Sequence, residues 1–160
     1  MKGKKPTRVY MDTSVLGGAF DREFERGSLA FLEQVRAGKF GLVLSAVVEE
    51  EIMAAPARVQ SLYRSLLPLA EIVATTEAAL QLREAYWAAK ILPAQWAADA
   101  LHVALATASG CAMIVSWNFR HIVHYKKIAL YNAVNIREGY AAIGIHTPQE
   151  VIEYEKEEKL

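Results

Sequence analysis

Short apolar segments alternate with longer helical segments along this sequence, and that alternation constrains the fold more than any other feature. Five apolar segments have the length of short β-strands: residues 9–11, 40–44, 72–73, 113–116 and 143–145. Strands that alternate with helices form a mostly parallel sheet with helices on both faces. We therefore predict an α/β fold, a three-layer α/β/α arrangement with a central, mostly parallel sheet of four to five short strands.

Helical periodicity fills the intervals between these strands, and Gly38, Pro56 and Pro68 end three of the periodic segments. The predicted helices span residues 21–37, 47–55, 58–67, 77–90, 94–109 and 149–156, and residues 120–131 are partly helical. A length of 160 residues suits one domain with a sizeable core, and no repeat, linker or low-complexity segment divides it. We predict a single domain over residues 1–160.

The first predicted strand ends at an acid. Asp12 follows residues 9–11, and two hydroxyl side chains, Thr13 and Ser14, come next. In an open α/β sheet, ligands bind in the crevice beyond the carboxyl ends of the strands. The Asp12 carboxylate is therefore either a metal or substrate contact, or an N-cap that accepts backbone N–H groups from the following helix.

Further polar side chains stand in apolar surroundings, after other strands or on apolar helices: Glu49, Glu50, Glu51, Asp99, Ser116 and Asn118. Within the glutamate triplet we choose Glu51, because on a helix it shares a face with Val47 and Ala55 and projects toward packed protein. Glu49 and Glu50 are expected to face solvent.

Asp99 has no lysine or arginine three or four residues away, so it does not form an ordinary surface ion pair within its own helix. Burying a carboxylate without a partner costs several kcal/mol or keeps it protonated. Carboxylates gathered at strand ends form a negative pocket, and Mg²⁺ or Mn²⁺ is its natural occupant. Two alternatives remain: Asp99 as a first-turn acid favoured by the helix dipole, and Asn118 as a turn residue.

Composition permits a polyanionic partner without requiring one. Lysine plus arginine equals aspartate plus glutamate, at 18 each, and 53% of residues are hydrophobic. Basic residues nevertheless cluster at Lys2, Lys4, Lys5 and Arg8 and again between residues 120 and 127, whereas residues 150–160 are acidic on balance. The single cysteine, Cys111, excludes an intramolecular disulfide and a cysteine-based zinc site. We read Cys111 as a buried thiol in a cytoplasmic protein.

We predict neither a signal peptide nor a transmembrane helix. The basic N-terminus lacks a long apolar segment after it. The uncharged segment between Asp99 and Arg120 is about as long as a membrane span. Gly110 divides this segment, so we interpret it as a buried helix, a turn and a buried strand.

Four segments resemble the PIN domain family, in the order in which that family carries them: residues 9–15, the Glu51-Ile52 pair, residues 98–104 and residues 115–122. The similarity is to the prokaryotic branch grouped with VapC-type toxins of type II toxin–antitoxin systems. It extends along nearly the whole chain. The resemblance implies a PIN-like fold and a metal-dependent endoribonuclease that acts on RNA, has a cognate antitoxin protein and forms a homodimer.

The resemblance also implies roles for particular residues. Asp12, Glu51 and Asp99 match the acidic ligands of a Mg²⁺ or Mn²⁺ ion. Asn118 falls where many members carry a fourth acid, so it belongs to the implied catalytic set but adds no negative charge for a second metal ion.

Other residues are expected to support the site or the substrate. Ser14 matches the small polar residue beside the first acid, and Ser116 matches a supporting Ser/Thr position. His102 lies one helical turn from Asp99. It either hydrogen-bonds Asp99 or finds its hydrogen-bond partner in the core. Candidate contacts to RNA phosphates, with a solvated surface or a structural turn as the alternative, are Arg120, His121, Lys126 and Lys127.

Three functions are consistent with this sequence. The first is a Mg²⁺-dependent endoribonuclease that is the toxin of a toxin–antitoxin pair. The second is a stand-alone PIN nuclease without an antitoxin. The third is a catalytically weak module of the same fold that binds RNA or protein, which Asn118 and the zero net charge favour.

Overall fold

A five-stranded parallel sheet forms the centre of the molecule. The computed structural model describes residues 5–153. The strands are β1 (Thr7–Met11), β2 (Phe40–Ser45), β3 (Ala70–Val73), β4 (Met113–Val115) and β5 (Gly144–His146), in the spatial order β3-β2-β1-β4-β5. Every neighbouring pair is parallel. The predicted α/β class is confirmed, and the sheet is parallel throughout.

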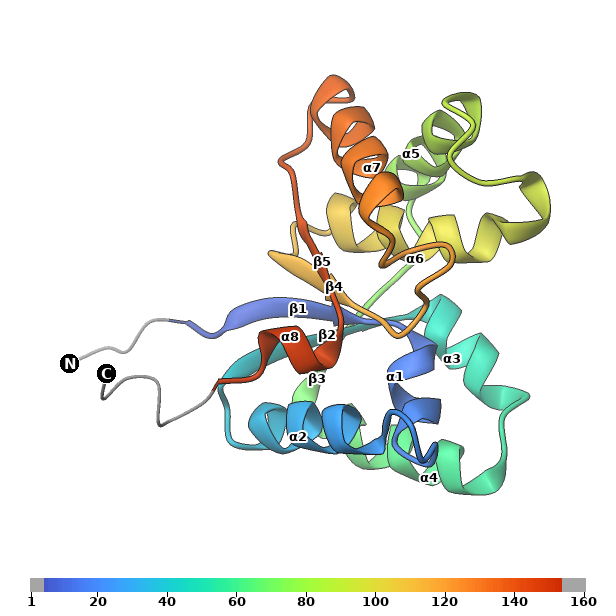
Figure 1. The fold of residues 1–160 in the computed structure, drawn as a ribbon. Coiled ribbons are helices and arrows are strands. Elements are labelled where there is room, and N and C mark those ends of the chain that lie inside the picture. The colour runs from blue at the N-terminus through green and yellow to red at the C-terminus, as the bar shows by residue number, and fades with distance from the viewer. Residues whose placement is uncertain (1–4, 154–160) are drawn as a thin grey trace.

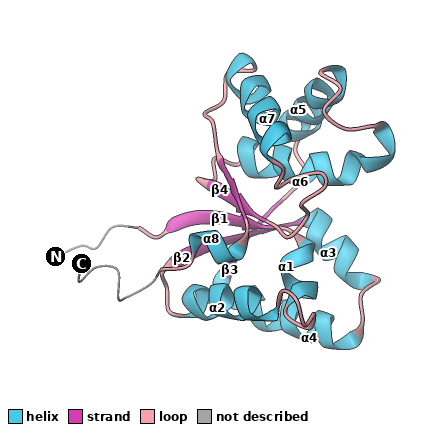
Figure 2. Ribbon diagram, viewed as in Figure 1, coloured by secondary structure: helices cyan, strands magenta, loops and turns pink. Residues whose placement is uncertain are grey.

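Helices cover both faces of the sheet. They are α1 (Thr13–Gly18), α2 (Glu25–Arg36), α3 (Ala46–Met53), α4 (Ala57–Leu66), α5 (Glu77–Ala88), α6 (Ala97–Ala108), α7 (Tyr125–Arg137) and α8 (Pro148–Val151), with short 3₁₀ turns η1 (Leu67–Leu69) and η2 (Ala94–Trp96). Figure 1 shows α5, α6 and α7 on one side of the strands and α1, α2, α4 and α8 on the other. Figure 2 shows the same three layers by secondary structure.

The strand order reverses beside β1. The chain runs from β1 outward through β2 to β3, then returns and continues through β4 to β5 on the opposite side of β1. Such a reversal opens a crevice at the carboxyl ends of the two strands that meet there, and this is where ligands bind in open α/β sheets. Asp12 follows β1 and Ser116 follows β4, so both lie at this crevice.

Buried apolar side chains hold β1 in the middle of the sheet. Val9, Tyr10 and Met11 have no exposed surface, since they are flanked by strands and covered by helices on both faces. Apolar residues without strict alternation are typical of such a strand. Cys111 is buried, as predicted. Among the described residues, no helix has both the length and the apolar character that a membrane crossing requires.

Several element boundaries differ from the predicted ones. The helix expected over residues 21–37 begins only at Glu25, and a separate α1 precedes it because Asp12 caps a helix directly after β1. The helix expected over 120–131 begins at Tyr125 and continues to Arg137. The helix expected over 149–156 spans Pro148–Val151 in the described part, and residues 154–156 lie outside the described residues, as do Lys2 and Lys4.

Candidate active site

Asp12 lies at the carboxyl end of β1, and only 4% of the residue is exposed. Its Oδ1 accepts hydrogen bonds from the Ser14 backbone N–H at 3.1 Å and from the Ser14 hydroxyl at 2.6 Å. Its Oδ2 accepts one from the Ser116 hydroxyl at 2.6 Å. The side chain therefore caps α1, as one of the two interpretations predicted, and it links the ends of β1 and β4.

The environment of Asp12 disfavours its charge. Burial raises the pKa of this carboxyl group, and the nearby Glu51 carboxylate raises it further. The charge of His102 and the hydrogen bonds from Ser116 and Ser14 lower the pKa again, but only in part. An ionised Asp12 is therefore a site at which an added cation is favourable.

Glu51 turns from α3 toward the same crevice. Its Oε1 accepts hydrogen bonds from the Thr13 hydroxyl at 2.6 Å and from His102 Nε2 at 2.7 Å. Burial raises the pKa of Glu51, but the two contacts with His102 and the bond from Thr13 outweigh it, so the pKa is lowered overall. Glu49 and Glu50 are exposed, which agrees with the choice of Glu51 from the triplet.

Asp99 lies in the first turn of α6, so the first-turn alternative describes its place on the helix. It also has a protein partner, which its own helix did not reveal. Its Oδ2 lies 2.8 Å from Nδ1 of His121, in the turn after β4. The Trp96 ring packs on the His121 ring, with centroids 4.4 Å apart. The absence of a lysine or arginine partner for Asp99 on its own helix holds, and the partner is a histidine from another element.

His102 contacts one of the three acids, Glu51, and feels the charges of the other two. Its Nδ1 lies 2.7 Å from the Tyr10 hydroxyl and its Nε2 contacts Glu51, so of the two alternatives for His102 these contacts support the partner in the core and not the bond to Asp99. Burial lowers the pKa of His102, but the hydrogen bond to Glu51 and the charges of Asp12, Glu51 and Asp99 raise it overall. The imidazole therefore lies within electrostatic reach of three carboxylates that are far apart in the sequence.

Asn118 serves as a turn residue. Its Oδ1 accepts the backbone N–H of His121 at 2.9 Å, and its own N–H donates to the Ser116 hydroxyl at 2.9 Å. These contacts fix the turn that holds His121 against Asp99. The turn alternative is thereby confirmed, while a role for Asn118 toward a metal ion stays a prediction.

The predicted RNA-contacting residues lie in this turn and at the start of α7, and only His121 among them contacts one of the acids, Asp99. Arg120 and Lys126 are exposed, and Lys127 is half-buried at the start of α7. His121 is buried, and its backbone carbonyl accepts a hydrogen bond from the Tyr131 hydroxyl at 2.9 Å. The structural role predicted as the alternative for His121 is the one that these contacts support.

The sequence matches the PIN domain family over residues 9–127, a span that includes the three acids and Asn118. The chain belongs to the PIN domain family. Proteins of this family are generally nucleases that use divalent metal ions. No curated protein matches the chain.

Two solved structures share the PIN fold with this chain. One is a chain of VapBC2 from Rickettsia felis bound to a DNA fragment from their promoter, with 16% identity, a TM-score of 0.53, and coverage of 71% of this chain and 90% of that one. The other is a chain of FitAB bound to an IR36 DNA fragment, with 15% identity, a TM-score of 0.58, and coverage of 92% and 99%. At these identities the likeness is one of fold.

The acids of this PIN domain suit a divalent ion in donor type and charge. Glu51 Oε2 and Asp99 Oδ1 accept no hydrogen bond from any described residue, so oxygen donors remain available. Within residues 5–153, no three His, Cys, Asp or Glu side chains come close enough to form a ready-made cage. Mg²⁺ commonly binds one or two carboxylates and keeps several waters, so the residues present fit such an ion.

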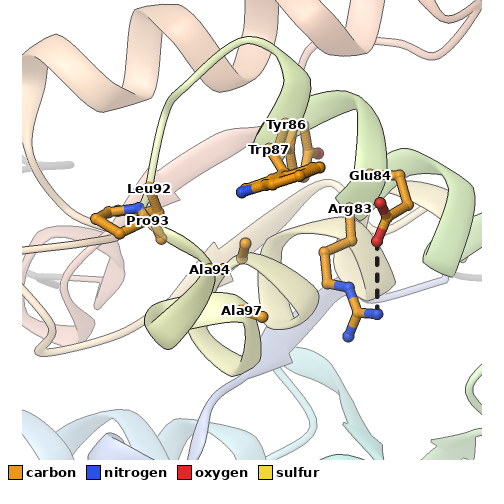
Figure 3. A pocket seen from close by; sticks show the side chains of 9 residues that line it. Arg83, Glu84, Tyr86, Trp87, Leu92, Pro93, Ala94 and Ala97 are labelled. Carbon is orange, nitrogen blue, oxygen red and sulfur yellow. Dashed lines mark ion pairs between the residues drawn. The ribbon is translucent and has the colours of Figure 1, made fainter.

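An apolar cavity lies apart from these acids. It has a volume of about 240 Å³ between α5 and η2, and Tyr86, Trp87, Leu92 and Pro93 line it together with alanines of η2 and α6. Figure 3 shows that the charged groups there are Arg83 and Glu84, which pair with each other. This cavity lacks the acids and the serines of the crevice, so we place the candidate active site at the crevice.

Sequence reasoning missed three polar residues of the site. Thr13 contacts Glu51, Tyr10 contacts His102, and Ser45 contacts the Tyr10 hydroxyl at 2.7 Å. One signal was available for Tyr10: a tyrosine within a fully buried strand needs a partner for its hydroxyl. The identity of that partner depends on α6, which is remote in sequence.

Proposed function

We propose that this PIN domain is a Mg²⁺- or Mn²⁺-dependent endoribonuclease and the toxin of a type II toxin–antitoxin pair. One observation carries the proposal: Ser116 holds Asp12 at the ends of β4 and β1, while Thr13, the next residue, and His102 of α6 both contact Glu51 of α3. These contacts gather carboxylates from the end of β1 and from α3 at the crevice, with Asp99 one helical turn from His102 on α6, and a divalent ion offsets their negative charge. The fold family, whose members are generally nucleases, supports the same conclusion.

Phosphodiester hydrolysis places three demands on a site: a nucleophilic water, a fixed line of approach and neutralisation of charge on the phosphoryl oxygens. A bound divalent ion supplies a more acidic water and Lewis acidity. In this chain, Asp12, Glu51 and Asp99 are the residues that would hold such an ion. Ser14 and Ser116 fix the Asp12 carboxylate, and Thr13 and His102 fix that of Glu51.

The substrate and the partner follow from the same assignment. Arg120 and Lys126 are exposed beside the turn after β4, where their charges meet the phosphates of an RNA chain entering the crevice. The two solved neighbours are chains of complexes that also contain DNA. We infer a small antitoxin protein that binds this chain and suppresses cleavage, and a homodimer as the functional unit in the cytoplasm.

The test is RNA cleavage by the purified chain with Mg²⁺, with Mn²⁺ and with EDTA. We expect Asp12→Asn and Glu51→Gln to lower the cleavage rate by at least about 100-fold, since loss of a metal ligand costs more than loss of an outer partner. Glu50→Gln is the matched control, because Glu50 precedes Glu51 on α3 and is exposed. It should retain the wild-type rate.

Cleavage that persists in EDTA, or in both Asp12→Asn and Glu51→Gln, would rule out this site. Cleavage that is metal-dependent but unaffected by co-expression with the protein encoded by the adjacent gene would favour a stand-alone nuclease. A chain that binds RNA and does not cleave it under any metal condition would favour the binding module.

A further inference from the structure

A chain of buried hydrogen bonds runs from the core to the candidate active site. The Ser45 hydroxyl lies 2.7 Å from the Tyr10 hydroxyl, which lies 2.7 Å from Nδ1 of His102. Nε2 of His102 lies 2.7 Å from Glu51 Oε1. Ser45 and Tyr10 have no exposed surface and His102 only 2%. Water therefore has no access to Ser45, Tyr10 or His102.

The direction of the last bond is fixed by chemistry. A carboxylate only accepts hydrogen bonds, so Nε2 of His102 carries a proton toward Glu51 in both the neutral and the charged imidazole. In the neutral ring, Nδ1 is an acceptor, so the Tyr10 hydroxyl donates to it and the Ser45 hydroxyl donates to Tyr10. Ser45 keeps a lone pair for the Val48 N–H, which it accepts as N-cap of α3.

These bonds orient the Glu51 carboxylate. Thr13 and His102 both donate to Oε1, and no described residue donates to Oε2. One oxygen is thereby anchored by the protein while the other stays available to a ligand. The rotation of the His102 ring decides where its Nε2–H points, and Tyr10 fixes that rotation through Nδ1.

We propose that Tyr10 and His102 are positioning residues, which act through Glu51 and touch neither metal nor substrate. The proposal rests on the proposed function in one respect, that Glu51 is a metal ligand. It predicts that the Tyr10 hydroxyl, in the centre of the sheet, controls the affinity of the site for a divalent ion. Substitution of a residue that hydrogen-bonds a metal ligand typically changes metal affinity 10- to 100-fold.

The primary experiment is Mn²⁺ titration by calorimetry of the full chain, as wild type, Tyr10→Phe and Tyr86→Phe. Tyr86 is the matched control: it is 1% exposed, and its hydroxyl donates to Asn135, between α5 and α7. We expect Tyr10→Phe to weaken Mn²⁺ binding about 10- to 100-fold and Tyr86→Phe to leave it unchanged. RNA cleavage by Tyr10→Phe should recover when Mn²⁺ is raised.

Equal Mn²⁺ affinity in wild type and Tyr10→Phe would overturn the proposal, and so would an equal loss in Tyr86→Phe. If Tyr10→Phe does not fold, His102→Asn and His102→Gln decide. The glutamine retains an N–H near the Nε2 position, and the asparagine does not, so His102→Gln should bind Mn²⁺ more tightly than His102→Asn. The reverse order, or equal affinities, contradicts the proposal.

These outcomes separate the two proposals. A wild-type chain that binds Mn²⁺ but cleaves no RNA refutes the proposed function, while the Tyr10 comparison still decides the positioning role. A wild-type chain that binds no Mn²⁺ refutes both.

Discussion

Asp12 is the residue at which stability and the proposed function conflict. The carboxylate is buried and its pKa is raised, so the folded chain binds a proton at Asp12 more tightly than the unfolded chain does. The free energy of unfolding therefore falls as pH rises from about 3.9, the ordinary value, through the folded value, and it stays lower above that. Above the folded value, the ionised Asp12 destabilises the metal-free protein.

Asp12→Asn removes this cost. We expect the variant to unfold at a higher temperature than wild type at pH 7 in EDTA, and to lose that advantage near pH 3, where Asp12 is protonated. Asparagine is as good an N-cap as aspartate, so the cap of α1 is retained. Thermal unfolding followed by circular dichroism at both pH values checks this. If Asp12→Asn instead melts at a lower temperature than wild type at pH 7, the cost of burying the Asp12 carboxylate is already offset within the protein.

Residues whose role depends on local periodicity were predictable. Glu51 was distinguished from Glu49 and Glu50 because the face of a helix follows from spacing alone. The partner of Asp99 was not predictable in this way, since His121 comes from a different turn of the chain. For the same reason, Tyr10 was expected only to be buried, and its contact with His102 depends on how α6 lies on β1.

At the scale of elements, α1 shows why the boundaries of short helices escaped prediction. Gly17 and Gly18 both lie inside α1, although glycine is unfavourable within a helix. A helix of six residues with two glycines has little intrinsic stability. It forms because Asp12 caps its start and because its last turn packs beneath Trp117, whose ring stacks on Phe24 with centroids 4.6 Å apart.

The two glycines of α1 give opposite predictions. A Cβ at Gly18 would lie 2.7 Å from Trp117 Nε1 and 2.8 Å from the Ser28 hydroxyl, which hydrogen-bond each other. Gly18→Ala is therefore expected to destabilise the chain by about 1–3 kcal/mol. A Cβ at Gly17 meets nothing within 4 Å. Gly17→Ala should stabilise the chain by about 0.5–1 kcal/mol, because alanine is the better helix former.

Urea unfolding of both glycine variants measures these changes directly. Because the two positions are adjacent on the same helix, a difference between them reports the contact with Trp117 and not helix propensity. Equal stabilities for Gly18→Ala and Gly17→Ala would show that Trp117 moves aside without cost.

At the scale of the whole molecule, a bound divalent ion should stabilise the fold as well as the site. Because the acids come together only in the folded chain, the ion binds the native state and not the unfolded one. At a Mn²⁺ concentration of 100 times Kd, the stabilisation is about 2.7 kcal/mol, and each kcal/mol raises the melting temperature of a domain of this size by about 2–4 °C. Differential scanning calorimetry across a Mn²⁺ series tests this.

Asp12→Asn is the control for that series, since it should show little or no rise with Mn²⁺. A rise of equal size in wild type and Asp12→Asn would place the ion elsewhere on the surface.

The α/β class and the strand positions were predictable, because alternation of segments is a property of the sequence. The order β3-β2-β1-β4-β5, which creates the crevice, depends on packing between distant segments.

The position of β1 between β2 and β4 delays completion of the candidate site during synthesis. The first acid emerges from the ribosome early, but the serine that fixes it follows β4, more than 100 residues later. A growing chain that ends before β4 has its hydrophobic centre open on one side and an incomplete crevice. The candidate site is therefore incomplete in any nascent chain that lacks β4 and the serine after it.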